Sequence, residues 1–401
     1  MDDTIRRISQ KMDRIVKLKP KKEKAVLNKH PWVFSGAVAK ASAKDGDIVE
    51  VVDADNRFLA YGFYSSESQI VCRLFEWDKS NNKFDDAYWS AKIDRAIQLR
   101  KSIIDFASTN AYRLLHAEGD FLPGLIADVY KDTLVLQISI KGIEQRKELF
   151  FDIFRKAGYS FIYLRSSGSS KKNLDVKSDG LWIAGEDKGP FEVMENGLKF
   201  MVDVVEGQKT GFFLDQRDNR ELVKRFSSNK KVLNAFSYTG GFSVYAQAGG
   251  AEEVHSLDIS GDAVKGAEEN VLLNFPTASH KSIAKDCFEY LKDMQENYYD
   301  LIILDPPAFA KSAAAVDRAA RGYKDINMRA FRKIKKGGVL FTYSCSQHIT
   351  KDLFQKIIFG AAADSGRNVR ILFQLHQPAD HPVNLYHPEG EYLKGLALWV
   401  E

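Results

Sequence analysis

The stretch from residue 232 to residue 258, VLNAFSYTGGFSVYAQAGGAEEVHSLD, decides the fold. It begins with an apolar run over Val232–Ala235 that predicts a short buried strand, and a turn containing two glycines follows. Spaced apolar residues then predict a helix through Ala248, and Val254–Asp258 predicts a second strand. Because a strand, a helix and another strand form the repeating unit of parallel sheets, the stretch predicts an α/β fold.

The same alternation continues to the end of the chain. Apolar runs predict further strands at residues 282–285, 301–304, 339–344, 369–373 and 397–400. We therefore expect a Rossmann-like domain whose sheet has seven parallel strands, with helices on both faces.

Two smaller domains are expected before this sheet. A β-rich domain over residues 1–80 is predicted by short strands at 15–18, 47–52, 58–61 and 69–75. A central mixed α/β domain over residues 81–190 is predicted by helices at 86–107 and 145–156, strands at 112–115, 124–129, 134–140 and 161–165, and an exposed polar loop at 166–172. The Rossmann-like domain then covers residues 191–401.

The composition of the 401 residues is that of an ordinary globular protein, with 44% hydrophobic and 28% charged residues. It excludes a disordered chain and a collagen-like repeat. No apolar run is long enough for a transmembrane helix, and the first ten residues lack the apolar core of a secretory signal. The three cysteines, Cys72, Cys287 and Cys345, lie far apart and form no C-x-x-C pair, which argues for a reducing, cytoplasmic setting and against a zinc site.

The amino terminus carries most of the excess positive charge. The formal net charge of the chain is only +4, but residues 1–30 hold ten Lys or Arg against four Asp or Glu. A basic arm indicates a polyanionic partner, although a solvated charged terminus has the same composition. Phosphate contacts and a stacking aromatic residue suit looped RNA, so the candidate RNA-binding residues are Lys21, Lys22, Lys29 and Trp32. Trp32 could equally belong to the core of the β-rich domain.

Ligands of open α/β sheets bind beyond the carboxyl ends of the strands, so the residues that follow each strand are the candidates for a site. Asp258 ends the second strand, where a carboxylate can accept hydrogen bonds from two ribose hydroxyls or cap the next helix. Asp286 follows the third strand, where it can accept a hydrogen bond from an adenine amino group or form part of a surface turn.

The fourth strand leads into Asp305-Pro-Pro-Ala-Phe309, the most specific short motif of the chain. Two prolines stiffen this loop, which then presents a carboxylate and an aromatic ring to a planar substrate. The fifth strand runs into Cys345, whose neighbours are polar. If these two strands are neighbours, Asp305 and Cys345 face the same crevice, whereas Cys72 and Cys287 are expected in the core.

These motifs together resemble those of class I S-adenosylmethionine-dependent methyltransferases. Two further segments, Gly207–Arg217 and Leu27–Gly36, resemble the segment before the catalytic core and the start of the PUA domain in the RlmI-like and RlmO-like family of large-subunit ribosomal RNA methyltransferases. The resemblance implies methylation of carbon 5 of a cytidine in 23S ribosomal RNA, with S-adenosylmethionine as cofactor and Cys345 as nucleophile. It also allows a homodimer.

The cofactor contacts that follow from the resemblance and from the turn after the first strand form one set. They are Phe212, Gln216, Arg217, Asn234, Phe236, Ser237, Tyr238, Gly240, Asp258, Asp286 and Asp305. One position departs from the pattern of many RNA cytosine methyltransferases, because Pro307 stands where those enzymes carry a second cysteine that assists product release.

The residue chemistry fits carbon-5 methylation. Carbon 5 of cytosine is a poor nucleophile, but a thiolate that adds to carbon 6 makes it enamine-like, and cysteine has a usable thiolate fraction near neutral pH. Asp305 would hold the amidine edge of the base and stabilise charge. A base must afterwards remove the carbon-5 proton, and the sequence does not identify it. A sulfonium methyl group is already activated, so no metal is expected.

Three alternatives remain open on the sequence. An Asp-Pro-Pro loop followed by an aromatic residue is also typical of enzymes that methylate exocyclic nitrogens of adenine or guanine, which need no thiol. A non-catalytic RNA-binding ribosome-assembly factor could carry the same fold. The third alternative is a nicotinamide dehydrogenase, but such enzymes typically carry the G-x-G-x-x-G fingerprint, which the chain lacks.

Overall fold

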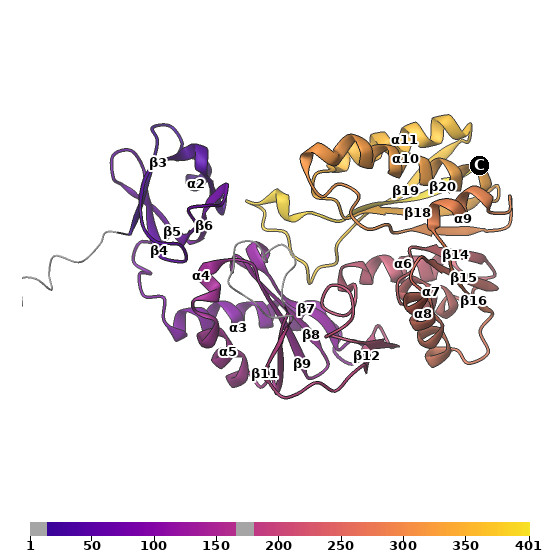
Figure 1. The fold of residues 1–401 in the computed structure, drawn as a ribbon, viewed down its shortest axis with the longest axis horizontal. Helices are drawn as coiled ribbons and strands as arrows, with labels where there is room; N and C mark the ends of the chain where they lie inside the picture. Colours follow the sequence, from indigo (N-terminus) through magenta and orange to yellow (C-terminus); the bar gives the residue numbers. More distant parts are fainter. Residues whose placement is uncertain (1–13, 166–179) are drawn as a thin grey trace, which may run out of the picture. The chain divides into compact units, whose positions relative to one another are not determined.

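The computed structural model describes residues 14–165 and 180–401 (Figure 1). The chain divides into two compact units, each considered by itself. The first holds residues up to 104, 112–188 and 380–390, and the second holds 105–111, 189–379 and 391–401. The stretch 380–390 therefore packs with the first unit, although the chain on both sides of it belongs to the second. The predicted three-domain boundaries stay a prediction, and the predicted loop at 166–172 lies outside the described residues.

The first sheet of the first unit has six strands. Their order is β2 (Trp32–Phe34), β6 (Ile70–Glu76), β5 (Phe58–Tyr64), β4 (Ile48–Val52), β1 (Ile15–Leu18) and β3 (Val38–Ser42), with the short helix α2 (Lys24–Leu27) beside them. Alternating side chains such as Val16, Leu18 and Val51 fill a small core that also contains Cys72. The β-rich character that the sequence predicts for this region is confirmed.

The second sheet of the first unit is covered by helices. Its strand order is β11 (Leu181–Ala184), β10 (Phe161–Leu164), β9 (Thr133–Ile138), β8 (Leu125–Tyr130) and β7 (Ala111–His116). The flanking helices are α3 (Asp86–Ile103), α4 (Lys141–Glu144) and α5 (Lys147–Lys156). Asp85 caps α3 by accepting a hydrogen bond from the Tyr88 N–H at 3.2 Å. The helix ends four residues before the predicted Ala107, because Ile104 adopts an extended conformation.

The second unit begins with a hairpin and continues as a seven-stranded sheet. The hairpin is β12 (Phe191–Glu195) and β13 (Leu198–Val202). The sheet order is β16 (His280–Ala284), β15 (Glu253–Asp258), β14 (Lys231–Ala235), β17 (Leu301–Leu304), β18 (Gly338–Ser344), β20 (Lys394–Val400) and β19 (Val369–His376). The Rossmann-like α/β class is confirmed.

One strand of this sheet runs against the prediction of seven parallel strands. β20 is antiparallel to both β18 and β19. The reason lies in the connection from β19 to β20, which contains only the 3-10 turn η6 (Pro388–Gly390). Without a crossover helix the chain returns antiparallel to the strand it has just left.

Helices cover both faces of the sheet, as predicted (Figure 1). The helices α9 (Cys287–Asp293), α10 (Val316–Lys333) and α11 (Lys351–Ser365) pack on one face through Leu291, Phe331 and Phe354. On the other face lie α6 (Arg217–Phe226), α7 (Gly241–Ala248) and α8 (Gly261–Asn274). The carboxyl ends of β14, β15, β17 and β18 meet at one edge, because Ala235 pairs with Leu257 and Leu304, and Leu304 pairs with Thr342.

Candidate active site

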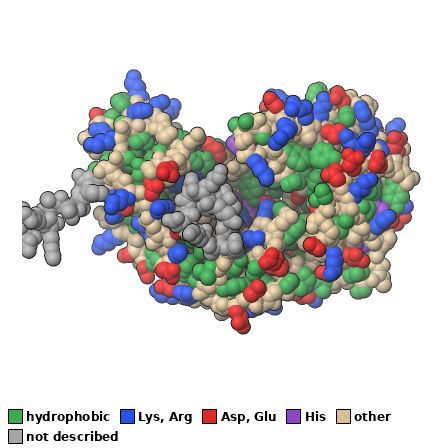
Figure 2. Space-filling model, in the orientation of Figure 1, with side chains coloured by type: hydrophobic (Ala, Val, Ile, Leu, Met, Phe, Trp, Pro, Cys, Tyr) green, Lys and Arg blue, Asp and Glu red, His purple; other side chains and the backbone are tan. Residues whose placement is uncertain are grey.

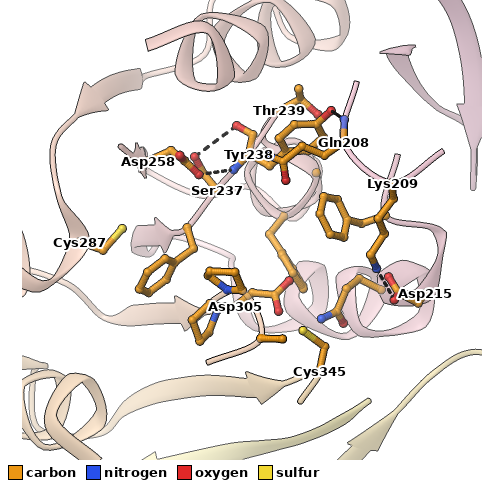
Figure 3. Close-up of a pocket in the computed structure, with 18 of the residues that line it drawn as sticks. Gln208, Lys209, Asp215, Ser237, Tyr238, Thr239, Asp258, Cys287, Asp305 and Cys345 are labelled. Atoms are coloured by element: carbon orange, nitrogen blue, oxygen red, sulfur yellow. Dashed lines mark hydrogen bonds and ion pairs between the residues drawn. The ribbon is translucent and has the colours of Figure 1, made fainter. Parts of the chain in front are cut away.

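A cavity of about 550 Å³ lies beyond this edge of the sheet (Figure 3). Its wall contains eight of the predicted cofactor contacts and the predicted nucleophile, namely Phe212, Gln216, Phe236, Ser237, Tyr238, Asp258, Asp286, Asp305 and Cys345. The volume falls within the usual range of small-molecule sites. Residues that are up to 133 positions apart in the sequence are thus brought into one pocket.

The turn after β14 holds the Asp258 carboxylate in place. Phe236 and Tyr238 both have positive φ, at 60° and 45°, which is rare for bulky residues and typical of functional sites. This conformation directs the Tyr238 N–H to Asp258 Oδ2 at 3.0 Å, while the Ser260 N–H donates to Oδ1 at 3.0 Å. Ser260, and not Asp258, caps α8. Asp258 is therefore an oriented acceptor at the cavity wall, as a ribose contact requires.

Asp286 and the aromatic rings form the next part of the wall. Asp286 accepts a hydrogen bond from the Glu289 N–H at 3.0 Å and so caps α9, while it also lines the cavity. The adenine contact stays a prediction, and the helix cap is a role that the sequence did not assign to Asp286. The rings of Phe236 and Phe288 lie 6.5 Å apart and give the wall an apolar surface. Oriented carboxylates beside aromatic rings suit a nucleoside such as that of S-adenosylmethionine.

Three of the predicted cofactor contacts, Arg217, Asn234 and Gly240, lie outside the cavity wall, and their contact with the cofactor stays a prediction. Arg217 is buried at the start of α6, with its Nε 3.6 Å from Asp218. The Asn234 amide is buried and donates to Ser243 Oγ at 2.9 Å. Gly240 has a φ of 77°, and a Cβ there would lie 2.7 Å from the Cβ of Ala267, so glycine permits the turn to pack against α8.

Asp305 and Cys345 end neighbouring parallel strands and line the same cavity, as the sequence predicts. Burial and the nearby Asp215 carboxylate raise the pKa of Asp305 to about 7. The side chain is therefore partly protonated at neutral pH and can donate a hydrogen bond from its acid form.

Cys345 is half-buried and is placed by its two neighbours. Ser344 and Ser346 point into the interior, where the hydroxyl of Tyr323 lies 3.0 Å from the Oγ of each. Cys345, between them, faces the cavity. Burial and the Asp305 carboxylate raise the pKa of its thiol to about 11. The thiolate fraction near neutral pH is therefore smaller than the fraction expected from the sequence. Cys72 and Cys287 are buried in the core, as predicted.

A cluster of polar residues around Asp215, in the cavity wall, was not predicted from the sequence. Lys209 Nζ lies 2.6 Å from Asp215 Oδ2 (Figure 3). The Tyr392 hydroxyl donates to the same oxygen at 2.7 Å. Lys209 also lies over the ring of Phe213, 4.3 Å from its centroid. The Gly207–Arg217 segment pointed to this region, but no local signal connects it with Tyr392, which lies 177 residues further on.

The predicted RNA-binding residues lie in the first unit. Lys21, Lys22 and Lys29 are exposed, and Figure 2 shows further Lys and Arg side chains on the same β-rich part at the upper left. Trp32 is half-buried. Its indole N–H donates to Glu118 at 2.8 Å, and the Arg73 guanidinium and the His387 ring lie 5.2 Å and 4.3 Å from its ring. The alternative that Trp32 is a packing residue therefore has direct support.

Within residues 14–165 and 180–401, no three His, Cys, Asp or Glu side chains are grouped so that they could hold a metal ion. Over the same ranges, no helix combines the length and the apolar character needed to cross a membrane.

Two family models match the chain. The model of S-adenosylmethionine-dependent methyltransferases matches residues 170–383, and the model of a PUA-like domain matches residues 16–77. A Streptococcus mutans protein described as a candidate SAM-dependent methyltransferase has the same fold, with a TM-score of 0.82 at 24% identity over 96% of this chain and 100% of its own. A second solved structure, of a protein described as a candidate methyltransferase in complex with SAH, superposes with the same TM-score at 24% identity, over 96% of this chain and 99% of its own.

Curated relatives are similar over nearly the whole chain. The ribosomal RNA large subunit methyltransferase I of Aeromonas salmonicida is 43% identical over 94% of this chain and 97% of its own. The protein of the same name from Escherichia coli is 40% identical over 94% of this chain and 97% of its own. The chain therefore belongs to the family of S-adenosylmethionine-dependent methyltransferases that includes these proteins, and S-adenosylmethionine is its cofactor.

Proposed function

We propose that this protein methylates carbon 5 of a cytidine in large-subunit (23S) ribosomal RNA through a covalent adduct with Cys345. The observation that carries the proposal is the placement of Asp305 and Cys345 at the ends of neighbouring strands, in the wall of one cavity. The names of the relatives support large-subunit ribosomal RNA as the substrate. The PUA-like domain supports an RNA partner.

The cofactor would be held by the oriented Asp258 carboxylate, by Asp286 and by the rings of Phe236 and Phe288. When bound, S-adenosylmethionine supplies the activated methyl group that carbon 5 receives. The remaining wall, with Asp305, Pro306 and Cys345, is left for the base.

Each of the two reactive residues has one task. The Cys345 thiolate adds to carbon 6 of the cytosine, so that a C–S bond forms and electron density moves to carbon 5. Asp305, with a pKa near 7, donates a hydrogen bond to nitrogen 3 and thereby stabilises the charge that the addition creates. A base then takes the carbon-5 proton, the electron pair of that C–H bond restores the C5–C6 double bond, and the C–S bond breaks so that the sulfur leaves with its electron pair.

The RNA interface would include more than the four residues that the sequence suggests. Phe34 and Tyr386 are 46% and 44% exposed, and Lys29 Nζ lies 5.8 Å from the Tyr386 ring. His387, in the same stretch, packs on Trp32. Exposed rings beside lysines are typical of surfaces that stack unpaired bases. Residues 380–390 thus extend the PUA-like surface with three exposed apolar side chains, Val383, Leu385 and Tyr386.

The test is methyl transfer from labelled S-adenosylmethionine to ribosomal RNA, with nucleoside analysis of the product. The wild type is expected to give 5-methylcytidine, and Cys345→Ala is expected to give none. Labelled methylpurine that survives in Cys345→Ala would favour an exocyclic-nitrogen methyltransferase, and RNA binding without any transfer would favour an assembly factor. The homodimer that the family resemblance allows and the cytoplasmic setting stay predictions.

A further inference from the structure

A buried lysine lies beside the residue that we propose as the nucleophile. Lys394 is the first residue of β20, where it pairs with Ser344 of β18, and its side chain is only 5% exposed. Its Nζ donates to the backbone carbonyl of Ser346 at 2.7 Å. The ammonium group is thereby fixed at the turn that carries Cys345, between Ser344 and Ser346.

This ammonium has no carboxylate partner within ion-pair distance among the residues that the structure describes. Its hydrogen bond goes to a neutral carbonyl, and Glu391 interacts with it only electrostatically. Burial of a lysine without a counter-charge is unfavourable, and it lowers the pKa of Lys394 to about 8. The unfavourable burial of the Lys394 ammonium indicates that this charge has a function in the protein.

The carboxylates near Cys345 disfavour its thiolate form. Burial and the carboxylates of Asp305 and Asp215 raise the pKa of the thiol, while Lys209, itself paired with Asp215, lowers it. Tyr323, on α10, also interacts electrostatically with Cys345, and its hydroxyl bonds to Ser344 and Ser346. Lys394 interacts electrostatically with Cys345 as well. Two lysines thus lie near Cys345. Lys209 is paired with Asp215, whereas Lys394 is buried and forms no ion pair with any residue that the structure describes.

We propose that Lys394 is a positioning residue whose ammonium group, held by the Ser346 carbonyl, is the counter-ion of the Cys345 thiolate. The inference rests on the proposed function, in which Cys345 is the nucleophile. The thiol loses its proton to solvent, and the sulfur anion then faces a fixed positive charge. When the C–S bond of the adduct breaks, the same ammonium stabilises the departing thiolate, which serves product release in a chain that has Pro307 in place of a second cysteine.

The experiment measures alkylation of Cys345 by iodoacetamide as a function of pH, with peptide mapping to identify the labelled cysteine. Lys394→Met is expected to raise the midpoint of the alkylation profile by about one pH unit or more, which means about tenfold slower labelling at a pH below both midpoints. Lys394→Arg keeps a cation and is expected to restore most of the rate. Lys356→Met removes a lysine from the exposed face of α11 and is expected to leave the profile unchanged.

An unchanged midpoint in Lys394→Met would overturn the proposal, provided that the buried Cys72 and Cys287 stay unlabelled and so report an intact fold. If this variant fails to fold, Cys345→Ser offers a second measurement. Loss of the thiolate is expected to lower the pKa of Lys394, followed by NMR of labelled lysine, and an unchanged pKa there would also overturn the proposal. Neither measurement uses RNA or cofactor, so failure here is distinct from failure to form 5-methylcytidine.

Discussion

Arg220 and Glu195 form a buried ion pair with two parallel hydrogen bonds, Nε to Oε1 at 2.8 Å and Nη2 to Oε2 at 2.7 Å. The pair joins α6 to β12, and the Tyr245 hydroxyl also donates to Glu195. Arg220 further donates to the Phe213 carbonyl at 2.9 Å. The pair therefore holds in place the segment that carries Phe212, Phe213 and Asp215 along the cavity wall.

Removing one partner of this pair should be strongly destabilising. Glu195→Ala leaves the Arg220 charge buried without its counter-ion, which typically costs about 3–5 kcal/mol. Urea unfolding, followed by fluorescence, measures the change. Asp352→Ala breaks an exposed pair with Lys356 and is expected to cost about 0.5 kcal/mol or less. Equal losses in the two variants would contradict this account.

Gly240 is expected to serve packing and not cofactor contact. Gly240→Ala combines an unfavourable positive φ with a close approach to Ala267 and should cost about 2–4 kcal/mol. The matched control is Gly366→Ala, where φ is a similar 72° but nothing lies within 4 Å of the added Cβ, so a loss of about 1 kcal/mol is expected. Thermal unfolding gives both values. A cofactor affinity that falls in Gly240→Ala without loss of stability would contradict the packing role.

Asp258 should contribute to cofactor affinity through its charge. Asp258→Asn keeps the shape of the side chain but weakens hydrogen bonds that a charged acceptor makes, so the dissociation constant of S-adenosylmethionine should rise about 10- to 100-fold. Isothermal titration calorimetry measures it. Asp262→Asn, on the exposed first turn of α8, should leave the affinity unchanged. A similar affinity for wild type and Asp258→Asn would remove this residue from the cofactor site.

The raised pKa of Asp305 predicts a pH-dependent stability. The folded protein holds a proton on Asp305 up to about pH 7, whereas the unfolded chain releases it near the ordinary aspartate pKa of 3.8. Between these values the folded state binds more protons, so this group's contribution to stability falls as pH rises. Asp305→Asn should therefore be more stable than wild type at pH 8 by about 1–3 kcal/mol, with a smaller difference at pH 4. Urea unfolding at both pH values tests this, with Asp317→Asn on the exposed side of α10 as control. A pH-independent difference would contradict the shift.

The residues at the parallel strand ends could be predicted because each ends or directly follows a buried strand. Asp258 is the last residue of β15, Asp305 follows β17 and Cys345 follows β18, and parallel strands bring their carboxyl ends to one edge. Tyr392 and Lys394 could not be predicted in the same way. Their placement depends on β20 running antiparallel to β18, and on a connection whose middle packs with the other unit. No local sequence pattern specifies either feature.

The same connection yields a prediction about RNA binding. If Phe34 and Tyr386 stack unpaired bases, alanine at either position should weaken binding of a single-stranded fragment of large-subunit ribosomal RNA by about 1–3 kcal/mol, which is about 5- to 150-fold. Lys29→Ala should also weaken binding, and in addition it should reduce the slope of affinity against salt concentration, because one phosphate contact is lost. Fluorescence anisotropy titrations at several salt concentrations measure both quantities.

The control for these variants is Phe359→Ala, since Phe359 is 74% exposed on α11 and lies outside the proposed interface. Its RNA affinity should equal that of the wild type. If Tyr386→Ala also binds like the wild type while Phe34→Ala does not, the interface is confined to the PUA-like sheet. Residues 380–390 would then only pack against this unit, because the one ring they expose beside Lys29 would contribute nothing to stacking.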